Sequence, residues 1–107
     1  MSSKRDKSKN KNKKFMRLAL NLARQNSGLT GSNPSVGSVI VKNDEIISVG
    51  ITSLGGTPHS ETNAIKNCKH NLKNSTLYVS LEPCNHYGKT PPCTNLIIKS
   101  GIKKVYY

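Results

Sequence analysis

Two short segments, far apart along the chain, constrain it more than any other feature of the sequence. The first begins at His59 and includes Glu61, and the second runs from Cys84 to Cys93. Zinc in proteins takes imidazole nitrogen and thiolate sulfur, and catalytic zinc sites use three protein ligands with water in the fourth position. One histidine and two cysteines match that count. The fold must therefore bring the two segments together, and we expect His59, Cys84 and Cys93 to bind one Zn²⁺ per chain.

Two of these residues are predicted to open helices. One predicted helix starts near His59 and runs to about residue 69, and the other spans about 92–99, with Cys93 near its start. Helix N-termini carry partial positive charge and free N–H groups, which together with a metal favour the thiolate form of Cys93. Glu61 lies two residues after His59, so the two do not share one side of a helix. They still converge if the helix points at the metal end-on.

The pattern also predicts a chemistry. Zinc lowers the pKa of its bound water, and a nearby carboxylate that is not a ligand moves the protons. His-x-Glu followed by Pro-Cys-x-x-Cys is typical of zinc deaminases. Here Glu61 fills the carboxylate position, but eight residues rather than two separate Cys84 from Cys93.

The longer loop carries a resemblance of its own. Leu81 to Cys93 reads LEPCNHYGKTPPC, and Ser32 to Gly37 reads SNPSVG. Both segments resemble the deaminase domain of riboflavin biosynthesis, which reads close to LEPCSHxGxTPPC and SNPxVG at these places. The apolar run Phe15–Arg24 is similar to the leading helix of that family. The resemblance extends from Phe15 to Tyr107.

This resemblance implies a fold and a reaction. The fold is the three-layer αβα sandwich of the cytidine-deaminase type, and the reaction is the zinc-dependent hydrolytic deamination of diaminohydroxyphosphoribosylaminopyrimidine, a pyrimidine ribotide. By motif position His59, Cys84 and Cys93 become the zinc ligands, and Glu61 becomes the catalytic proton shuttle. The family's relatives form homo-oligomers, so the same is expected here. Its deaminase domain continues beyond Tyr107 and a reductase domain often follows, so we expect both C-terminal parts to be absent.

Substrate contacts also follow from the resemblance. Asn33 is expected to hydrogen-bond the base, and Lys89 lies in the ligand loop, where a cation suits a ribose phosphate. Thr52 stands where some relatives carry a substrate-contacting histidine. Ser60 replaces the usual alanine between the histidine and the glutamate, a small change that we expect to be tolerated.

Hydrophobic periodicity independently predicts the order α-β-β-α-β-α-β for the domain. A helix follows Phe15, residues 36–51 read as a hairpin with a turn at Asn43-Asp44, and strands are expected at 76–81 and 102–107. The later βαβ unit predicts neighbouring parallel strands with helices covering the sheet. The last strand would then lie at an edge of the sheet.

The charge of the chain is concentrated at its start. Of the net charge of +12, residues 1–14 contribute seven Lys or Arg side chains and one Asp. Such a polar segment cannot bury apolar area, and we expect a disordered basic tail preceding a deaminase domain at 15–107. A solvated leader is favoured over a nucleic-acid-binding arm. No run is apolar enough for a membrane or a secretory signal, and three cysteines argue against a disulfide framework, so a cytoplasmic protein is expected.

Three other interpretations remain open from the sequence. The first is a structural zinc site, with His86 as a fourth ligand. The second is a zinc deaminase of another nucleoside or of a nucleic-acid base, against which the long loop between the cysteines argues. The third is a truncated, non-catalytic zinc-binding module.

Overall fold

The computed structural model describes the backbone of residues 2–80 and 93–107 and the side chains of 11–80 and 95–107. Seven elements follow one another in the described chain, in the predicted order. They are the helix α1 (Ser2–Gln25), the strands β1 (Gly37–Lys42) and β2 (Glu45–Ile51), the helix α2 (Ser60–Asn67), the strand β3 (Thr76–Val79), the helix α3 (Cys93–Ser100) and the strand β4 (Lys104–Tyr106).

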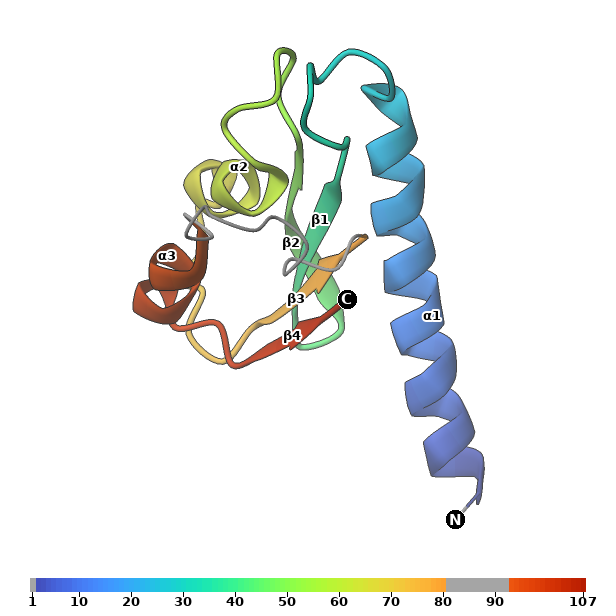
Figure 1. Cartoon of the computed structure of the whole chain (residues 1–107). Helices are drawn as coiled ribbons and strands as arrows, with labels where there is room; N and C mark the ends of the chain where they lie inside the picture. Colours follow the sequence, from blue (N-terminus) through green and yellow to red (C-terminus); the bar gives the residue numbers. More distant parts are fainter. Residues whose placement is uncertain (1, 81–92) are drawn as a thin grey trace.

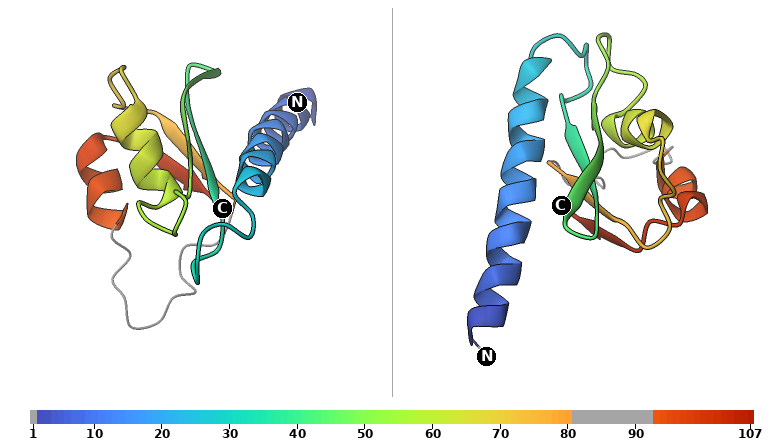
Figure 2. Two further views of the ribbon diagram at one scale, coloured as in Figure 1. Left: turned by 90° about the horizontal axis from the view of Figure 1, so that it is seen from above. Right: turned by 180° about the vertical axis from the view of Figure 1, so that it is seen from behind.

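The strands form one sheet in the order β2-β1-β3-β4. β1 runs antiparallel to both of its neighbours, whereas β3 and β4 are parallel, as the βαβ unit predicted. α1 covers one face of the sheet, and α2 and α3 lie together on the other face (Figures 1 and 2). The expected three-layer αβα architecture is therefore confirmed, with β4 at one edge.

Successive side chains of the central strands point to opposite faces of the sheet, and this divides the hydrophobic core into two clusters. Val39 and Val41 of β1 face α1, where they pack with Phe15 and Ala19. Ile40 points the other way, into a second cluster beneath α2 and α3. Because successive side chains of a strand point to opposite faces, a continuous apolar run is what a strand buried on both sides requires. The remaining buried members of the second cluster are Ala64, Leu72, Leu77 and Val79.

The turn of the hairpin follows from local chemistry. Asn43 and Asp44 connect β1 to β2 with positive φ values of 52° and 64°. Two consecutive residues with positive φ are typical of the type I′ turn, whose twist matches that of the flanking strands and which favours Asn and Asp. The predicted turn is confirmed at this position.

α1 extends further toward the N-terminus than the sequence suggested. The segment expected to be a disordered tail belongs to a 24-residue helix. Its contacts with the body begin before Phe15: Lys11 forms a 2.9 Å ion pair with Asp44, and Asn12 accepts a 2.6 Å hydrogen bond from the Tyr78 hydroxyl. Lysine has good helix propensity, so a lysine-rich segment continues a helix that is anchored on a sheet.

No helix in the described part of the chain is both long enough and apolar enough to cross a membrane. The longest of them, α1, is polar.

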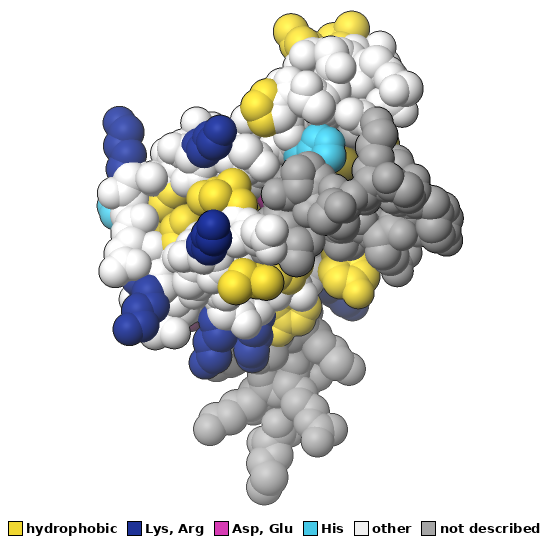
Figure 3. Space-filling view, turned by 60° about the vertical axis from the view of Figure 1, so that its left-hand side comes forward, with side chains coloured by type: hydrophobic (Ala, Val, Ile, Leu, Met, Phe, Trp, Pro, Cys, Tyr) yellow, Lys and Arg dark blue, Asp and Glu magenta, His cyan; other side chains and the backbone are white. Residues whose placement is uncertain are grey.

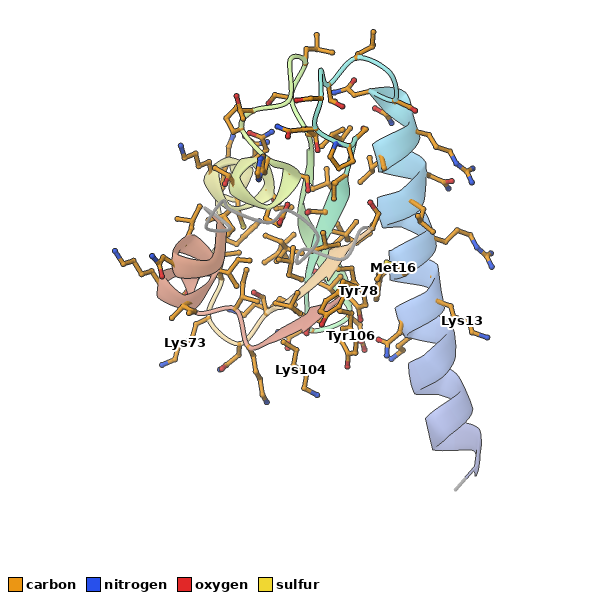
Figure 4. All side chains as sticks on the ribbon, viewed as in Figure 1. Lys13, Met16, Lys73, Tyr78, Lys104 and Tyr106 are labelled. Carbon is orange, nitrogen blue, oxygen red and sulfur yellow. The ribbon has the colours of Figure 1, made fainter. Side chains whose placement is uncertain are left out.

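The aromatic side chains join α1 to the sheet. Tyr78 stacks on Tyr106 with ring centroids 5.2 Å apart and meets Phe15 at 5.3 Å. Figure 4 shows Tyr78 and Tyr106 beside Met16, between the sheet and the helix. This cluster buries the hydroxyl of Tyr78 next to α1.

The Tyr78 phenol should make stability depend on alkaline pH. Burial, together with Tyr106 and Asp44, raises the pKa of Tyr78 above its usual value of about 10. Below that value both folded and unfolded chains keep the phenol proton. Above it only the unfolded chain loses the proton at first, so the free energy of unfolding should fall as pH rises toward the raised pKa. Urea unfolding across this range should show a steeper decline for the wild type than for Tyr78→Phe; equal slopes would contradict the assignment.

Candidate active site

Two of the predicted functional residues, His59 and Glu61, lie at the start of α2. His59 is the N-cap of the helix, in an extended conformation with φ −71° and ψ 162°, so the helix begins one residue after the histidine. The backbone carbonyl of His59 accepts a 3.0 Å hydrogen bond from the Asn63 N–H. His59 is therefore a half-buried residue that precedes the first turn of α2.

Glu61 is held in this turn by a neighbour. Its side chain is 9% exposed, and its Oε1 accepts a 2.8 Å hydrogen bond from the Ser60 hydroxyl. Ser60 is completely buried and bonds in turn to the Ser38 hydroxyl of β1, also at 2.8 Å. A carboxylate near the core is tolerated where a hydrogen bond compensates its lost hydration.

Sequence reasoning missed this role for the two serines. From the sequence, Ser60 is only a tolerated replacement for alanine, and Ser38 has no recognisable role. The available signal was Ser38 itself, a polar residue inside an otherwise apolar strand. A hydroxyl that a strand buries needs a partner, and the partner lies on the covering helix.

The loop that leads to His59 is braced from α2. The side-chain amide of Asn63 donates to the carbonyl of Ile51 at 2.7 Å and to the hydroxyl of Ser53 at 2.9 Å. These bonds close residues 51–58 onto the helix that follows them. Asn63 was not recognised from the sequence, because its partners are set by the return of the chain from β2.

Asn33 lies beside this loop. Its Nδ2 donates to the carbonyl of Gly56 at 3.0 Å, and the residue is half-buried. Gly56 has φ +102°, and a Cβ there would come within 2.6 Å of the Thr30 carbonyl oxygen and 2.9 Å of Asn33 Nδ2. A glycine at this position thus permits the close approach that orients the Asn33 amide.

Thr52, the third predicted substrate contact, is buried with 2% exposure. Its hydroxyl accepts the backbone N–H of Val36 at 2.8 Å, and its carbonyl accepts the side-chain amide of Asn26 at 2.8 Å. The described contacts therefore give Thr52 a bracing role between the ends of β1 and β2.

The remaining predicted residues lie largely outside the described part. Cys84 and Lys89 fall within the undescribed segment, and of Cys93 only the backbone is described, as the first residue of α3. Among the side chains that the structure does describe, no three His, Cys, Asp or Glu residues gather as a metal site. The predicted zinc ligands thus remain a prediction.

The donor types at these positions nevertheless suit zinc. His59 and Cys93 stand at the starts of α2 and α3, two helices that contact each other on the same face of the sheet (Figure 2). One imidazole and two thiols are a donor set that zinc prefers, and Glu61 adds a carboxylate two residues from the histidine. The residues present fit the metal.

The face that carries α2 and α3 is cationic. Figure 3 shows several Lys and Arg side chains across this face and very few acidic ones. The described lysines of these helices and of the segments beside them are Lys66, Lys69, Lys73, Lys99, Lys103 and Lys104. Lys66 and Lys99 lie in the last turns of α2 and α3, whereas His59 and Cys93 lie at the starts of these helices, so this charge does not mark the predicted metal site.

Comparisons with known proteins identify a family and several relatives. The family model of the cytidine and deoxycytidylate deaminase zinc-binding region matches residues 9–107. The riboflavin biosynthesis protein RibD of Aquifex aeolicus is 50% identical over 93 residues, which cover 87% of this chain and 26% of that protein. The diaminohydroxyphosphoribosylamino-pyrimidine deaminase of Buchnera aphidicola is 46% identical over 91 residues, 85% of this chain and 62% of that protein.

Solved structures show the same relationship. The deaminase/reductase of Thermotoga maritima superposes with a TM-score of 0.78 at 45% identity, over 90% of this chain and 28% of that one. The dCMP deaminase of cyanophage S-TIM5 superposes with a TM-score of 0.68 at 27% identity, over 90% and 80% of the two chains. The chain spans only about a quarter of the RibD relatives that it matches. It belongs to the cytidine and deoxycytidylate deaminase zinc-binding family, and its similarity to the deaminase part of RibD covers most of its length.

Proposed function

We propose that this chain hydrolytically deaminates diaminohydroxyphosphoribosylaminopyrimidine at a zinc ion held by His59, Cys84 and Cys93. The observation that carries the proposal is the position of the Glu61 side chain at the start of α2. Its carboxylate is nearly buried, lies two residues after the His59 N-cap, and is held there by a hydrogen bond from Ser60. The relatives named as RibD and as the pyrimidine deaminase supply the substrate class.

The chemistry divides between the metal and Glu61. When bound, zinc supplies a water of lowered pKa and Lewis-acid stabilisation. Glu61 accepts the two protons of the attacking water in turn and delivers one to the ring nitrogen and the other to the departing amine. Water adds to the ring carbon, the bond from that carbon to the exocyclic nitrogen breaks, and a carbonyl and ammonia are the products.

Substrate contacts are proposed for Asn33 and Lys89. Because Nδ2 of Asn33 is engaged by Gly56, its Oδ1 is the atom that we assign to an N–H donor of the base. Lys89 is assigned to the ribose phosphate as a point charge. For Thr52, the buried hydroxyl and its bond to Val36 favour an indirect role, in which it keeps the Asn33 side of the pocket in place.

Further parts of the proposal concern the whole protein. We propose that residues 15–107 form the deaminase domain and that the protein is homo-oligomeric and cytoplasmic. Size determination in solution tests the oligomeric state.

The proposed reaction is tested by ammonia release from the diaminopyrimidine ribotide, with zinc measured on the same sample. Turnover that depends on about one zinc per chain is expected. The dCMP deaminase among the structural relatives makes dCMP the competing substrate. Faster turnover of dCMP would replace the proposed substrate, and bound zinc without turnover of either compound would favour a non-catalytic module.

His59→Ala should remove the metal. Loss of one of three protein ligands should lower zinc affinity at least about 100-fold, because substitutions of residues that only hydrogen-bond to a ligand typically cost 10- to 100-fold. Zinc content after dialysis against a weak chelator measures this. His70→Ala, at an exposed histidine after α2, is the matched control and should keep its zinc. Full zinc retention by His59→Ala would contradict the ligand assignment.

A further inference from the structure

Two buried serines and Glu61 form a directed hydrogen-bond chain. Ser60 has one hydroxyl proton and donates it to Glu61 Oε1, so its oxygen must accept the bond that it shares with Ser38. The direction is therefore Ser38 to Ser60 to the carboxylate. Both bonds are 2.8 Å long, and both serines have no exposed surface.

The hydrogen-bond chain begins on a central strand of the sheet. Ser38 lies in β1, the strand that pairs with both β2 and β3, and its register partners are Gly50 and Val79. Its backbone is held on both sides, and its side chain points toward α2. The donor is thus fixed by the sheet, not by the loops around the site.

Without such a partner, the Glu61 side chain could rotate, and its carboxylate would spend less time in the orientation that proton transfer needs. Its side chain has three rotatable bonds, and ordering it costs conformational entropy. Proton transfer needs the carboxylate within hydrogen-bond reach of the reacting atoms. A fixed donor on one oxygen limits the rotation and directs the other oxygen.

We propose that Ser60, supported by Ser38, is a positioning residue that holds Oε1 of Glu61 so that Oε2 carries out the proton transfers. The inference rests on the proposed function and deepens it. It assigns separate tasks to the two carboxylate oxygens: Oε1 is the anchored oxygen, and Oε2 is the reacting one.

Kinetics of three alanine variants test the assignment. Ser60→Ala should lower kcat about 10-fold, as expected for losing one hydrogen bond to a charged acceptor, with KM within about twofold and zinc content unchanged. Ser38→Ala should lower kcat less, because Ser60 can still donate its hydroxyl proton to Glu61 Oε1. Ser75→Ala is the matched control, since Ser75 is equally buried but donates to the Leu72 carbonyl, and kcat should stay unchanged.

A double-mutant cycle separates positioning from general structural support. In the Glu61→Gln background, Ser60→Ala should cause no further loss of the residual turnover, because the group that it positions is already disabled. A further 10-fold loss in that background would overturn the proposal, as would a Ser60→Ala effect confined to KM.

Stability of the metal-free chain provides a readout independent of turnover. The effects of Ser38→Ala and Ser60→Ala on urea unfolding should be non-additive, because either change breaks the same bond. Strictly additive losses of unfolding free energy in the double variant would contradict the hydrogen bond between the two serines. If Ser60→Ala leaves kcat unchanged while Glu61→Gln loses turnover, this inference alone is overturned. If the zinc-loaded wild type shows no turnover, both the proposed function and the inference are overturned.

Discussion

Glu61→Gln should reduce turnover of the diaminopyrimidine ribotide by about 10³-fold while leaving zinc content unchanged. The substitution keeps the size of the side chain and an oxygen that accepts the Ser60 hydroxyl, but an amide cannot take a proton from water at neutral pH. General acid–base catalysis typically contributes 10²- to 10⁴-fold, which sets the expected loss. Ammonia release and metal content on the same preparation measure both quantities.

Glu45→Gln is the matched control for this experiment. Glu45 is exposed at the start of β2 and lies outside the proposed site, so the same chemical change there should leave kcat unaltered. Loss of zinc in Glu61→Gln would mean that Glu61 is a ligand. Retention of activity would mean that another group moves the protons.

Gly50→Ala should destabilise the fold where α2 meets the sheet. An added Cβ would come within 2.3 Å of the Ser60 carbonyl oxygen and 2.4 Å of the Ala64 backbone nitrogen. Both are backbone atoms of α2, so neither can move aside without shifting the helix. Overpacking of this kind costs about 1–3 kcal/mol, and contact with rigid backbone places the expected loss of unfolding free energy at about 3 kcal/mol. Urea unfolding of the two proteins measures the difference.

The same substitution should also impair catalysis, because α2 carries Ser60 and Glu61. Val49→Ala is the control on the same strand: Val49 is exposed, and its truncation should cost less than about 1 kcal/mol. Equal stability losses for the two variants would show that α2 does not lie as close to β2 as the structure has it.

The elements were largely predictable, because their signals are local. The hydrophobic spacing after Phe15, the turn residues Asn43 and Asp44 and the βαβ order each depend on residues close together in the chain. Boundaries were less accurate. The first helix begins at Ser2, before the apolar run, and its Lys11 and Asn12 have partners on the hairpin turn and on β3 that no local pattern encodes.

The sequence alone determined the family and the candidate chemistry, because zinc ligands and a proton-moving carboxylate are defined by residue type and spacing: His59, Glu61, Cys84 and Cys93 are recognisable without a fold. Only the tertiary structure decided how Glu61 is held and what surrounds it. Ser38 and Ser60 are 22 positions apart, and only the packing of α2 on β1 makes their hydroxyls neighbours. Gly50 and Asn63 likewise acquire their roles from chain segments that meet in space. Side-chain chemistry is a local property, whereas the orientation of a catalytic group depends on long-range packing.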